Sequence, residues 1–581
     1  MKNQPIPSDG HLPLARLAPV RNTRGILEDP VDANAASLID AATARRFRML
    51  PFGRDGDIVK VAAVDPEDPR LAIGLGRLGS RYRVFKASPQ DLSDALGRFY
   101  GGDRTARPRP SPRMAAYSAH TLLTRAQAVW LAATLALAAL AAIFAGAVVA
   151  TVLNAILQVL YAFIMGFKLW MSRRPSGETV EIVALPAEIA ALTDEDLPLY
   201  SVLIPLHREA EVLDVLLGAI DALDYPKDRL DVKLLLEGDD EETLGALRQR
   251  ALPPHIQPVV LRPAEPRTKP KALNEGLRLA RGEIVVIYDA EDIPEPDQLK
   301  KALVAFRKAG PRVACIQAKL SYFNRRQNLL TRFFTAEYAM WFDLVLPALQ
   351  AHDLPIPLGG TSNHVRREAL LQIGGWDAFN VTEDADLGIR LCRAGLRTGI
   401  VNSTTYEEAN SEFTNWVRQR SRWVKGYMQT WLVHMRHPRT LIRELGWKGF
   451  VGFQVMIFGT PFTFLFNPFY WALSMAWFLT SWNVIPAIFP TWVYYMAMVN
   501  LMFGGFVFSY MNMAACARYG LWDLVGTAAL SPVYWGVMSV GAWKAALQLV
   551  TRPSHWEKTA HGLTEITEAP TFYPAGEVTH G

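Results

Sequence analysis

The chain has 581 residues, a length that allows three or four domains. Half of the residues are hydrophobic and the mean hydropathy is +0.08, which is higher than in a typical soluble enzyme. The net charge is only +5, and no cluster of Lys and Arg interleaved with aromatic residues occurs, so we expect no binding to nucleic acid. Cys315, Cys392 and Cys516 share neither a disulfide spacing nor a metal-ligand spacing, and we expect each to be a small buried hydrophobic residue.

Residues 1–100 form a polar region, in which we predict short strands at 58–64 and 82–85 and a helix that ends near Tyr100. The runs at 44–51, 55–57 and 63–66 resemble the N-terminal domain of type II secretion ATPases, which predicts a small α+β domain. That domain binds cyclic di-GMP in some relatives. The glycine-rich nucleotide motif of those relatives is not evident in this sequence, which favours a docking module over a regulatory one.

Residues 101–125 are rich in Arg, Pro and Ser and are predicted to be a linker. The next apolar block, 127–170, holds a single charge, Lys168, near its end, where the side chain can reach the membrane surface. This length predicts two transmembrane helices over 126–172 with a tight turn near Gly146. Arg and Lys flank both outer ends of the block, so we expect both ends to lie in the cytoplasm.

A catalytic domain is predicted over 180–445, because apolar strand-like runs alternate with amphipathic helical stretches from 198 to 405. This pattern indicates an open, largely parallel α/β sheet, in which ligands bind at the carboxyl ends of the strands. The stretch 325–346 has apolar residues at helical spacing and is followed by Pro347. We predict an interfacial helix that stops at this proline, and a second such helix over 412–435.

Asp289 and Glu291 follow the predicted strand 283–287, with Asp292 directly after them. Carboxylates two residues apart at a strand end point the same way across the pleat. They can therefore share one divalent cation, and we predict a Mg²⁺ or Mn²⁺ site at Asp289 and Glu291. A solvated acidic pair is the alternative, since such pairs are common after strands.

A second apolar block, 449–517, contains no Asp, Glu, Lys or Arg. Its length predicts three spans with breaks near Pro468 and Pro486, and a further span covers 524–543. With the first pair this makes six spans, the last four lying within 449–548. The C-terminal tail, 549–581, then lies in the cytoplasm.

The run Gln419-Arg420-Ser421-Arg422-Trp423 lies between this catalytic region and the second apolar block. Its Gln-x-x-Arg-Trp pattern resembles the acceptor-binding signature of processive family 2 glycosyltransferases, such as the cellulose, chitin and hyaluronan synthases. The resemblance covers roughly 198–562. It implies a GT-A type nucleotide-sugar transferase domain between transmembrane helices, located in the bacterial plasma membrane with the catalytic domain and both termini in the cytosol.

The resemblance also implies roles for residues on the donor side. In the family, Pro-x-x-x-Glu after the first strand and acidic residues after the second hold uracil and ribose, and a lysine offsets the diphosphate charge. Either Glu237 or Asp239 takes the acidic position, and Lys269 takes the lysine position, with Lys271 as the alternative. The implied donor-binding residues are Pro205, His207, Glu209, Glu237, Asp239, Lys269, Asp289, Arg420 and Arg422.

On the acceptor side, Thr382-Glu383-Asp384 takes the place of the family's catalytic motif, which implies that Asp384 is the general base for an inverting transfer. Thr382 can also cap the helix predicted at 385–391. The small residues Gly360, Thr361 and Ser362 form the loop beneath the acceptor sugar. Gln419 and Trp423 contact the acceptor.

The tail sequence 552–562 resembles the family's gating loop, which implies that Trp556, Lys558 and Thr559 contact the donor. A basic segment next to the membrane is an equal alternative.

The resemblance as a whole implies polymerisation of UDP-glucose into a β-glucan of the mixed-linkage (1,3;1,4) or curdlan kind, with export through the same chain. The partners implied are UDP-glucose, the growing glucan, membrane lipid, and cyclic di-GMP or a periplasmic export protein. One rival is a non-processive glycosyltransferase with a lipid-linked acceptor. Another is a cyclic-di-GMP-sensing secretion component, suggested by residues 1–100 alone. The absence of a Walker motif speaks against that second rival.

Overall fold

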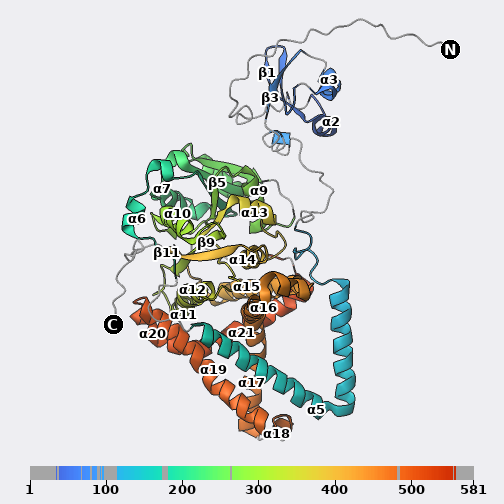
Figure 1. The fold of residues 1–581 in the computed structure, drawn as a ribbon, viewed down its shortest axis with the longest axis vertical. Helices are drawn as coiled ribbons and strands as arrows, with labels where there is room; N and C mark the ends of the chain where they lie inside the picture. The colour runs from blue at the N-terminus through green and yellow to red at the C-terminus, as the bar shows by residue number, and fades with distance from the viewer. Residues whose placement is uncertain are drawn as a thin grey trace, which may run out of the picture. The chain divides into compact units, whose positions relative to one another are not determined.

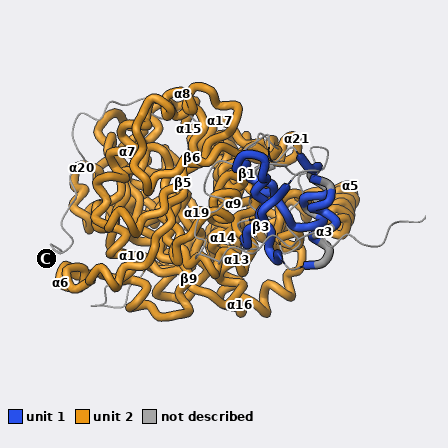
Figure 2. The backbone as a smooth tube through the Cα atoms, turned by 90° about the horizontal axis from the view of Figure 1, so that it is seen from above, with its two compact units in different colours: residues 1–107 blue, residues 108–581 orange. Residues whose placement is uncertain are grey.

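The computed structural model describes residues 38–66, 68–78, 81–87, 114–172, 181–261, 265–480, 484–553 and 555–557, and the single positions 35, 92, 95 and 96. The chain forms two compact units, residues 1–107 and residues 108–581, which Figure 2 shows in different colours. Each unit has its own core and is described by itself.

The N-terminal unit contains a three-stranded sheet in the order β1 (Met49–Asp55), β2 (Ile58–Ala63) and β3 (Tyr82–Lys86). β1 and β2 are antiparallel, whereas β2 and β3 are parallel and are joined through α3 (Pro69–Leu75). This confirms the strands predicted at 58–64 and 82–85. The helix predicted to end near Tyr100, and residues 101–113 of the predicted linker, lie outside the described residues.

The large unit is built on an eight-stranded sheet in the order β6-β5-β4-β7-β10-β9-β11-β8. Its strands are β4 (Tyr200–Leu206), β5 (Leu230–Glu237), β6 (Ile256–Leu261), β7 (Ile284–Ile287), β8 (Ile293–Pro294), β9 (Val313–Tyr322), β10 (Asn363–Arg366) and β11 (Arg397–Glu407). The α/β class is confirmed, but the sheet is mixed. β10 runs antiparallel to both of its neighbours, and β8 runs antiparallel to β11.

Helices cover both faces of this sheet, so its central strands β4 and β5 are buried on both sides. Alternation along β4 sends Val202 and Ile204 into one core, which they share with α7 (Leu213–Asp221) and α10 (Gln298–Ala309). Leu203 points into the other core, with α9 (Lys269–Leu279). The remaining helices near the sheet are α6 (Pro186–Ala190), α8 (Glu241–Arg248), α13 (Arg367–Ile373) and α14 (Glu383–Arg393).

Two helical segments lie between the sheet and the long apolar helices (Figure 1). One is α15 (Phe413–His434), close to the range predicted for it. The other consists of α11 (Leu329–Tyr338), a π-helical stretch (Ala339–Val345) and α12 (Leu346–Ala351). The predicted stop at Pro347 is wrong, because the backbone stays helical from the π-helical stretch into α12, and this proline lies in the first turn after that stretch.

The first apolar block forms α5 (Arg125–Ser172), which bends at Ala145 (φ −146°, ψ 46°), next to the turn predicted at Gly146. Figure 1 shows two arms that diverge from this bend. The first arm exposes large apolar side chains, including Trp130 at 75% and Phe144 at 81%. Contact with lipid would cover such a surface.

The second apolar block differs from its prediction. After α16 (Pro438–Phe453) and a π-helical stretch (Gln454–Phe458), α17 (Gly459–Thr480) continues through Pro468, so no break occurs there. The predicted break near Pro486 is present, occupied by the short α18 (Val484–Ile488) before α19 (Thr491–Arg518). Residues 449–517 therefore form two long helices rather than three.

The span predicted over 524–543 is instead a pair of helices, α20 (Trp522–Ala529) and α21 (Ser531–Thr551). The helix direction bends by 67° between them. By length and composition, three described helices can cross a membrane, or four if this pair counts as one. α5 is one of the three, although it is bent. Cys315 and Cys516 are buried as expected, whereas Cys392 is only partly buried.

Candidate active site

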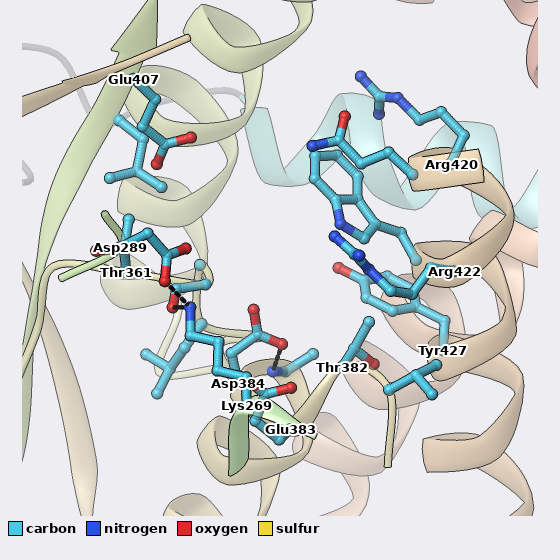
Figure 3. A pocket seen from close by; sticks show the side chains of 18 of the residues that line it. Lys269, Asp289, Thr361, Thr382, Glu383, Asp384, Glu407, Arg420, Arg422 and Tyr427 are labelled. Carbon is cyan, nitrogen blue, oxygen red and sulfur yellow. Dashed lines mark hydrogen bonds and ion pairs between the residues drawn. The ribbon is translucent and has the colours of Figure 1, made fainter. Parts of the chain in front are cut away.

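A cavity of about 540 Å³ lies at the edge of the sheet where β4, β5 and β7 end. β10 runs the opposite way, so the loop before its first residue reaches the same edge. The cavity extends from this edge to α15 and on to side chains of the apolar helices, among them Lys168, Phe508 and Trp535. Figure 3 shows an acidic side, with Asp289, Asp384 and Glu407, facing Arg420 and Arg422.

The cavity wall near β4 and β5 contains four of the residues assigned to donor binding: Pro205, His207, Glu209 and Glu237. Asp239, the alternative to Glu237, does not line the cavity and pairs with Arg267 at 2.5 Å. The neighbouring Asp240 caps α8 and accepts the Arg208 backbone N–H at 2.5 Å. Of the two acidic candidates, Glu237 is the one that the fold places at the cavity.

Lys269 opens α9 and extends into the cavity, where its amino group forms an ion pair with Asp289 and donates to the Gly360 carbonyl at 2.8 Å. Burial disfavours its charge, but the carboxylates of Asp289 and Glu383 more than offset this and raise the pKa of Lys269. The alternative lysine, Lys271, instead pairs with Glu237 at 3.1 Å.

Asp289 and Glu291 both line the cavity, while Asp292 lies beneath them with 1% of its surface exposed. Asp292 accepts the Asp289 backbone N–H at 2.7 Å and the Thr361 hydroxyl, so it supports the turn. Among the described residues, no group of three or more His, Cys, Asp or Glu is arranged to hold a metal. Two carboxylates still fit Mg²⁺, which commonly binds through one or two carboxylates, water and substrate phosphates.

Thr382, Glu383 and Asp384 line the cavity at the start of α14. Burial and the neighbouring Asp384 raise the pKa of Glu383 to about 8, while burial raises the pKa of Asp384 to about 6. The Ala385 backbone N–H, which donates to Asp384 at 2.7 Å, favours the ionised form of Asp384. Of the two neighbouring carboxyl groups, Asp384 is thus the one whose ionised form is favoured by a hydrogen bond to Ala385, which suits Asp384 to accept a proton. Thr382 caps α14 only through its backbone, because its side-chain hydroxyl has no partner in the structure.

The loop before β10 brings Gly360 and Thr361 to the cavity, whereas Ser362 is fully buried and bonds to Thr405 at 2.7 Å. A Cβ atom at Gly360 would lie 3.3 Å from an Asp384 carboxylate oxygen. Glycine at this position therefore keeps open the space beside Asp384.

Four residues of the Gln-x-x-Arg-Trp run line the cavity from α15: Gln419, Arg420, Arg422 and Trp423. Arg420 is already engaged, since it forms two hydrogen bonds to Glu337, at 2.9 and 2.5 Å, and lies 4.1 Å from the centre of the Phe334 ring. The ion pair fixes α15 against α11. Removing one partner of such a buried pair typically costs about 3–5 kcal/mol.

Arg422 is the second arginine of the run, and it contacts the C-terminal tail. Its guanidinium lies 4.8 Å from the centre of the Trp556 ring and donates to the Glu557 carbonyl at 3.0 Å. Lys425 donates to the His555 carbonyl at 2.7 Å. Trp556 lines the cavity, while Lys558 and Thr559, which were assigned with it to the gating loop, lie outside the described residues.

Several cavity residues were not predicted from the sequence. Glu407 ends β11, and the pairing of Tyr406 with Ile293 places it opposite Asp292, beside the predicted metal site. Glu337 and Lys168 reach the cavity from α11 and α5. Tyr427 lines the cavity from α15, directly after Gly426. The glycine at 426, three positions after Trp423, was the one sequence signal that another element packs closely on α15 here.

Comparison with known proteins agrees with this site. Residues 284–502, less than half of the chain, match the glycosyl transferase family group 2 model, and residues 23–106 match the MshEN domain model. The first match includes the Asp289, Asp384 and Trp423 motifs but begins after β4 and β5. The matches support a glycosyltransferase enzyme.

Three curated relatives are similar to part of this chain. The probable glycosyltransferase YdaM of Bacillus subtilis is 29% identical over 40% of this chain and 56% of its own length. The beta-monoglucosyldiacylglycerol synthase of a Synechocystis strain is 29% identical over 43% of this chain and 52% of its own. Cellulose synthase 2 of Novacetimonas hansenii is 30% identical over 40% of this chain and 15% of its own. The chain thus spans about half the length of its relatives, or less.

Proposed function

We propose that the protein is an inverting, processive glycosyltransferase that adds glucose from UDP-glucose to a growing β-glucan and moves the product through its own membrane helices. The observation that carries this proposal is the cavity, which runs from Asp289 and Asp384 to Phe508 and Trp535 of the apolar helices. A nucleotide-sugar site that opens toward membrane helices suits an enzyme whose product leaves in that direction.

On the donor side, His207, Glu209 and Glu237 bind the base and ribose, and the diphosphate lies near Lys269 and Arg422. Asp289 and Glu291 hold a Mg²⁺ or Mn²⁺ ion, which neutralises the charge of the leaving diphosphate. Lys269 already neutralises Asp289 in the structure. We infer that it turns to the phosphates when donor and metal bind.

On the acceptor side, Asp384 accepts the proton of the attacking hydroxyl, opposite the departing diphosphate. The terminal sugar stacks on Trp423, whose ring lies 6.2 Å from that of Tyr338 and is held at a 27° angle to it. Gln419 is held by Asn410 at 2.9 Å, so its free donor groups can face sugar hydroxyls.

A second cavity, of about 840 Å³, supports the export step. It lies among α5, α17, α19 and α21 and is lined by aromatic residues with amphipathic rings, among them Trp471, Trp477 and Tyr494, together with amides such as Asn467. Trp535 lines both cavities. Aromatic rings and amides suit a sugar chain, which needs both stacking and hydrogen bonding.

A non-processive transfer to a lipid-linked acceptor is the second candidate, and two observations favour it. The described helices give three or four spans instead of the six expected, which leaves fewer helices to enclose a path. Lys168 also lines the membrane end of the active-site cavity, where its amino group lies 5.0 Å from the centre of the Phe508 ring. A lysine at this point is suited to bind the anionic head group of a lipid-linked acceptor.

For the N-terminal unit we propose a regulatory or docking role, supported by the MshEN match over 23–106. Cyclic di-GMP or a periplasmic export protein are the partners proposed for the whole protein. The enzyme is placed in the bacterial inner membrane with both termini in the cytosol. A cyclic-di-GMP-sensing secretion component without its own chemistry is less well supported, because the donor and base residues share one cavity.

The chemical nature of the product distinguishes processive glucan synthesis from transfer to a lipid-linked acceptor. Purified protein supplied with radiolabelled UDP-glucose and Mg²⁺ should form material of high molecular weight that linkage-specific β-glucanases degrade. Asp384→Asn, which keeps the size of the side chain, is the matched control and should form none. A product that is soluble in organic solvent and carries one or a few sugars would instead support lipid glycosylation and contradict processive synthesis.

A further inference from the structure

The segment before α5 packs on the catalytic domain, directly behind the residues that present Asp384. We call residues 114–121 the strap and residues 377–382 the base loop. Met114, Ser118 and Ala119 of the strap are almost fully buried, with 1–3% of their surface exposed. This burial is unusual for a linker and shows that the strap is part of the catalytic core.

Asp377 connects the strap to the base loop. Its carboxylate accepts the Ser118 hydroxyl at 2.7 Å through one oxygen and the Ala119 backbone N–H at 2.6 Å through the other. The Phe379 N–H, from the base loop itself, is a third donor at 3.2 Å. Asp377 has no exposed surface, so these donors replace water around it.

Arg436, just after the end of α15, holds the other side of the strap. Its guanidinium donates to the carbonyls of Ala116, at 3.0 Å, and Ser118, at 2.9 Å, and to that of Thr121. The His120 ring contacts the Phe379 ring edge-on, with their centres 4.7 Å apart. Polar and aromatic contacts therefore fix the strap to both the base loop and α15.

The base loop in turn is held to both sides of the active site. The Thr268 hydroxyl, next to Lys269, donates to the Ala378 carbonyl at 2.9 Å. Asn380 donates to the Thr430 hydroxyl at 2.9 Å, and the Val381 N–H donates to Gln429 at 3.1 Å. A shift at Asp377 would thus be passed along a loop that is hydrogen-bonded at Ala378, Asn380 and Val381 to Thr382 and Asp384.

We propose that Asp377 is a positioning residue for the catalytic base and that the strap keeps it in place. Without the strap, the buried Asp377 carboxylate keeps a single described donor, the Phe379 N–H. The loop that carries Asp384 would then relax away from its position. This inference rests on the proposed glycosyl transfer, in which Asp384 is the base.

The test compares three full-length variants: Ser118→Ala, Asp377→Asn and the control Thr124→Ala. Thr124 follows the strap, and among the described residues its side chain bonds only to Gln127, at the start of α5. We expect Ser118→Ala to lower kcat about tenfold, the effect of one hydrogen bond to a charged group. Asp377→Asn should lower kcat up to about 100-fold, as for a displaced catalytic group. Thr124→Ala should match the wild type.

Two further measurements separate positioning from a general loss of structure. The dissociation constant for UDP should stay within about twofold of wild type, because Lys269 and Asp289 keep their contacts. Hydrogen–deuterium exchange should become faster in peptides covering 376–385 and unchanged in β4 and β5. If Asp377→Asn fails to fold, the kcat, UDP affinity and hydrogen exchange of Ser118→Ala test the inference by themselves.

Unchanged kcat and exchange in Ser118→Ala would overturn the inference, and so would a parallel loss of UDP binding and kcat. A wild-type protein that transfers no sugar would refute the proposed function instead. The exchange measurement would still report whether the strap holds the base loop.

Discussion

At the scale of single residues, the ionisable side chains that line the cavity lie in pairs. Lys269 lies against Asp289, and Asp384 lies beside Glu383, whose pKa burial and the neighbouring Asp384 raise. Because burial raises the pKa of both carboxyl groups, they cannot both be ionised at low cost. The pair therefore provides one charged carboxylate at the place where a proton must be accepted.

The pH dependence of kcat follows from this arrangement. Asp384 accepts a proton only when ionised, so activity should rise with pH through about 6, its raised pKa, and level off above it. Asp384→Asn should cut kcat by roughly 10²–10⁴-fold and abolish the rise, while UDP binding, measured by calorimetry, stays near normal. A variant with wild-type turnover, or a profile without the acidic limb, would show that another group is the base.

Removing the metal gives a second residue-scale prediction. Chelator should abolish transfer, and Mg²⁺ or Mn²⁺ should restore it in the wild type and in Asp214→Ala, whose carboxylate pairs with Arg250 outside the cavity. Asp289→Ala should not recover, because it removes one of the two carboxylates proposed to hold the ion. Full activity in excess chelator would mean that Lys269 and Arg422 neutralise the diphosphate without a metal.

The sequence predicts residues of this site well where they follow strands. Glu237 ends β5 and Asp289 follows β7 by two residues, and the strand pattern alone brings them to one edge. It does not predict that Arg420 is neutralised by Glu337, 83 residues earlier, because a partner so distant in sequence is fixed only by packing. Choices within a motif, such as Glu237 over Asp239, also depend on side-chain direction.

At the scale of elements, α15 organises the site. It carries Arg420, Arg422 and Trp423, packs against α21, and contacts the base loop through Gln429. Its approach to α14 depends on Gly426. A Cβ atom at this position would lie 2.2 Å from the Thr382 hydroxyl oxygen and 2.4 Å from its methyl carbon.

Gly426→Ala should therefore push Thr382 and the start of α14 away from α15. We expect activity to fall by more than about tenfold and stability by about 1–3 kcal/mol, as for other overpacked sites. Gly218→Ala, at a helical glycine with no atom within 4 Å of the new methyl group, is the matched control and should have neither effect. Equal activity of the two variants would contradict a close α14–α15 contact.

Helix boundaries were the least predictable feature of the elements. Proline at 347 and 468 indicated breaks, yet both helices continue. Pro347 lies two residues after a π-helical stretch, where the helical hydrogen-bond pattern changes, and Pro468 lies within an apolar helix, a position that membrane helices tolerate. The sequence shows where the prolines are, but packing against the neighbouring helices determines whether a helix breaks at them.

At the scale of the whole large unit, two cavities meet at Trp535. The first contains the residues proposed for sugar transfer, and the second is lined by residues of the apolar helices. Figure 1 shows these helices, α5, α17, α19 and α21, on one side of the sheet. If the chain that grows in the first cavity enters the second, synthesis and export occur in one polypeptide. That coupling is the central claim of this account.

Sealed vesicles with the catalytic domain facing outward test the claim most directly. Purified protein in such vesicles, given labelled UDP-glucose outside, should deposit polymer in the lumen, where external β-glucanase cannot degrade it until detergent is added. Asp384→Asn vesicles provide the background. If all the labelled polymer is degraded from outside while the vesicles remain intact, the product does not pass through this chain, and the claim is wrong.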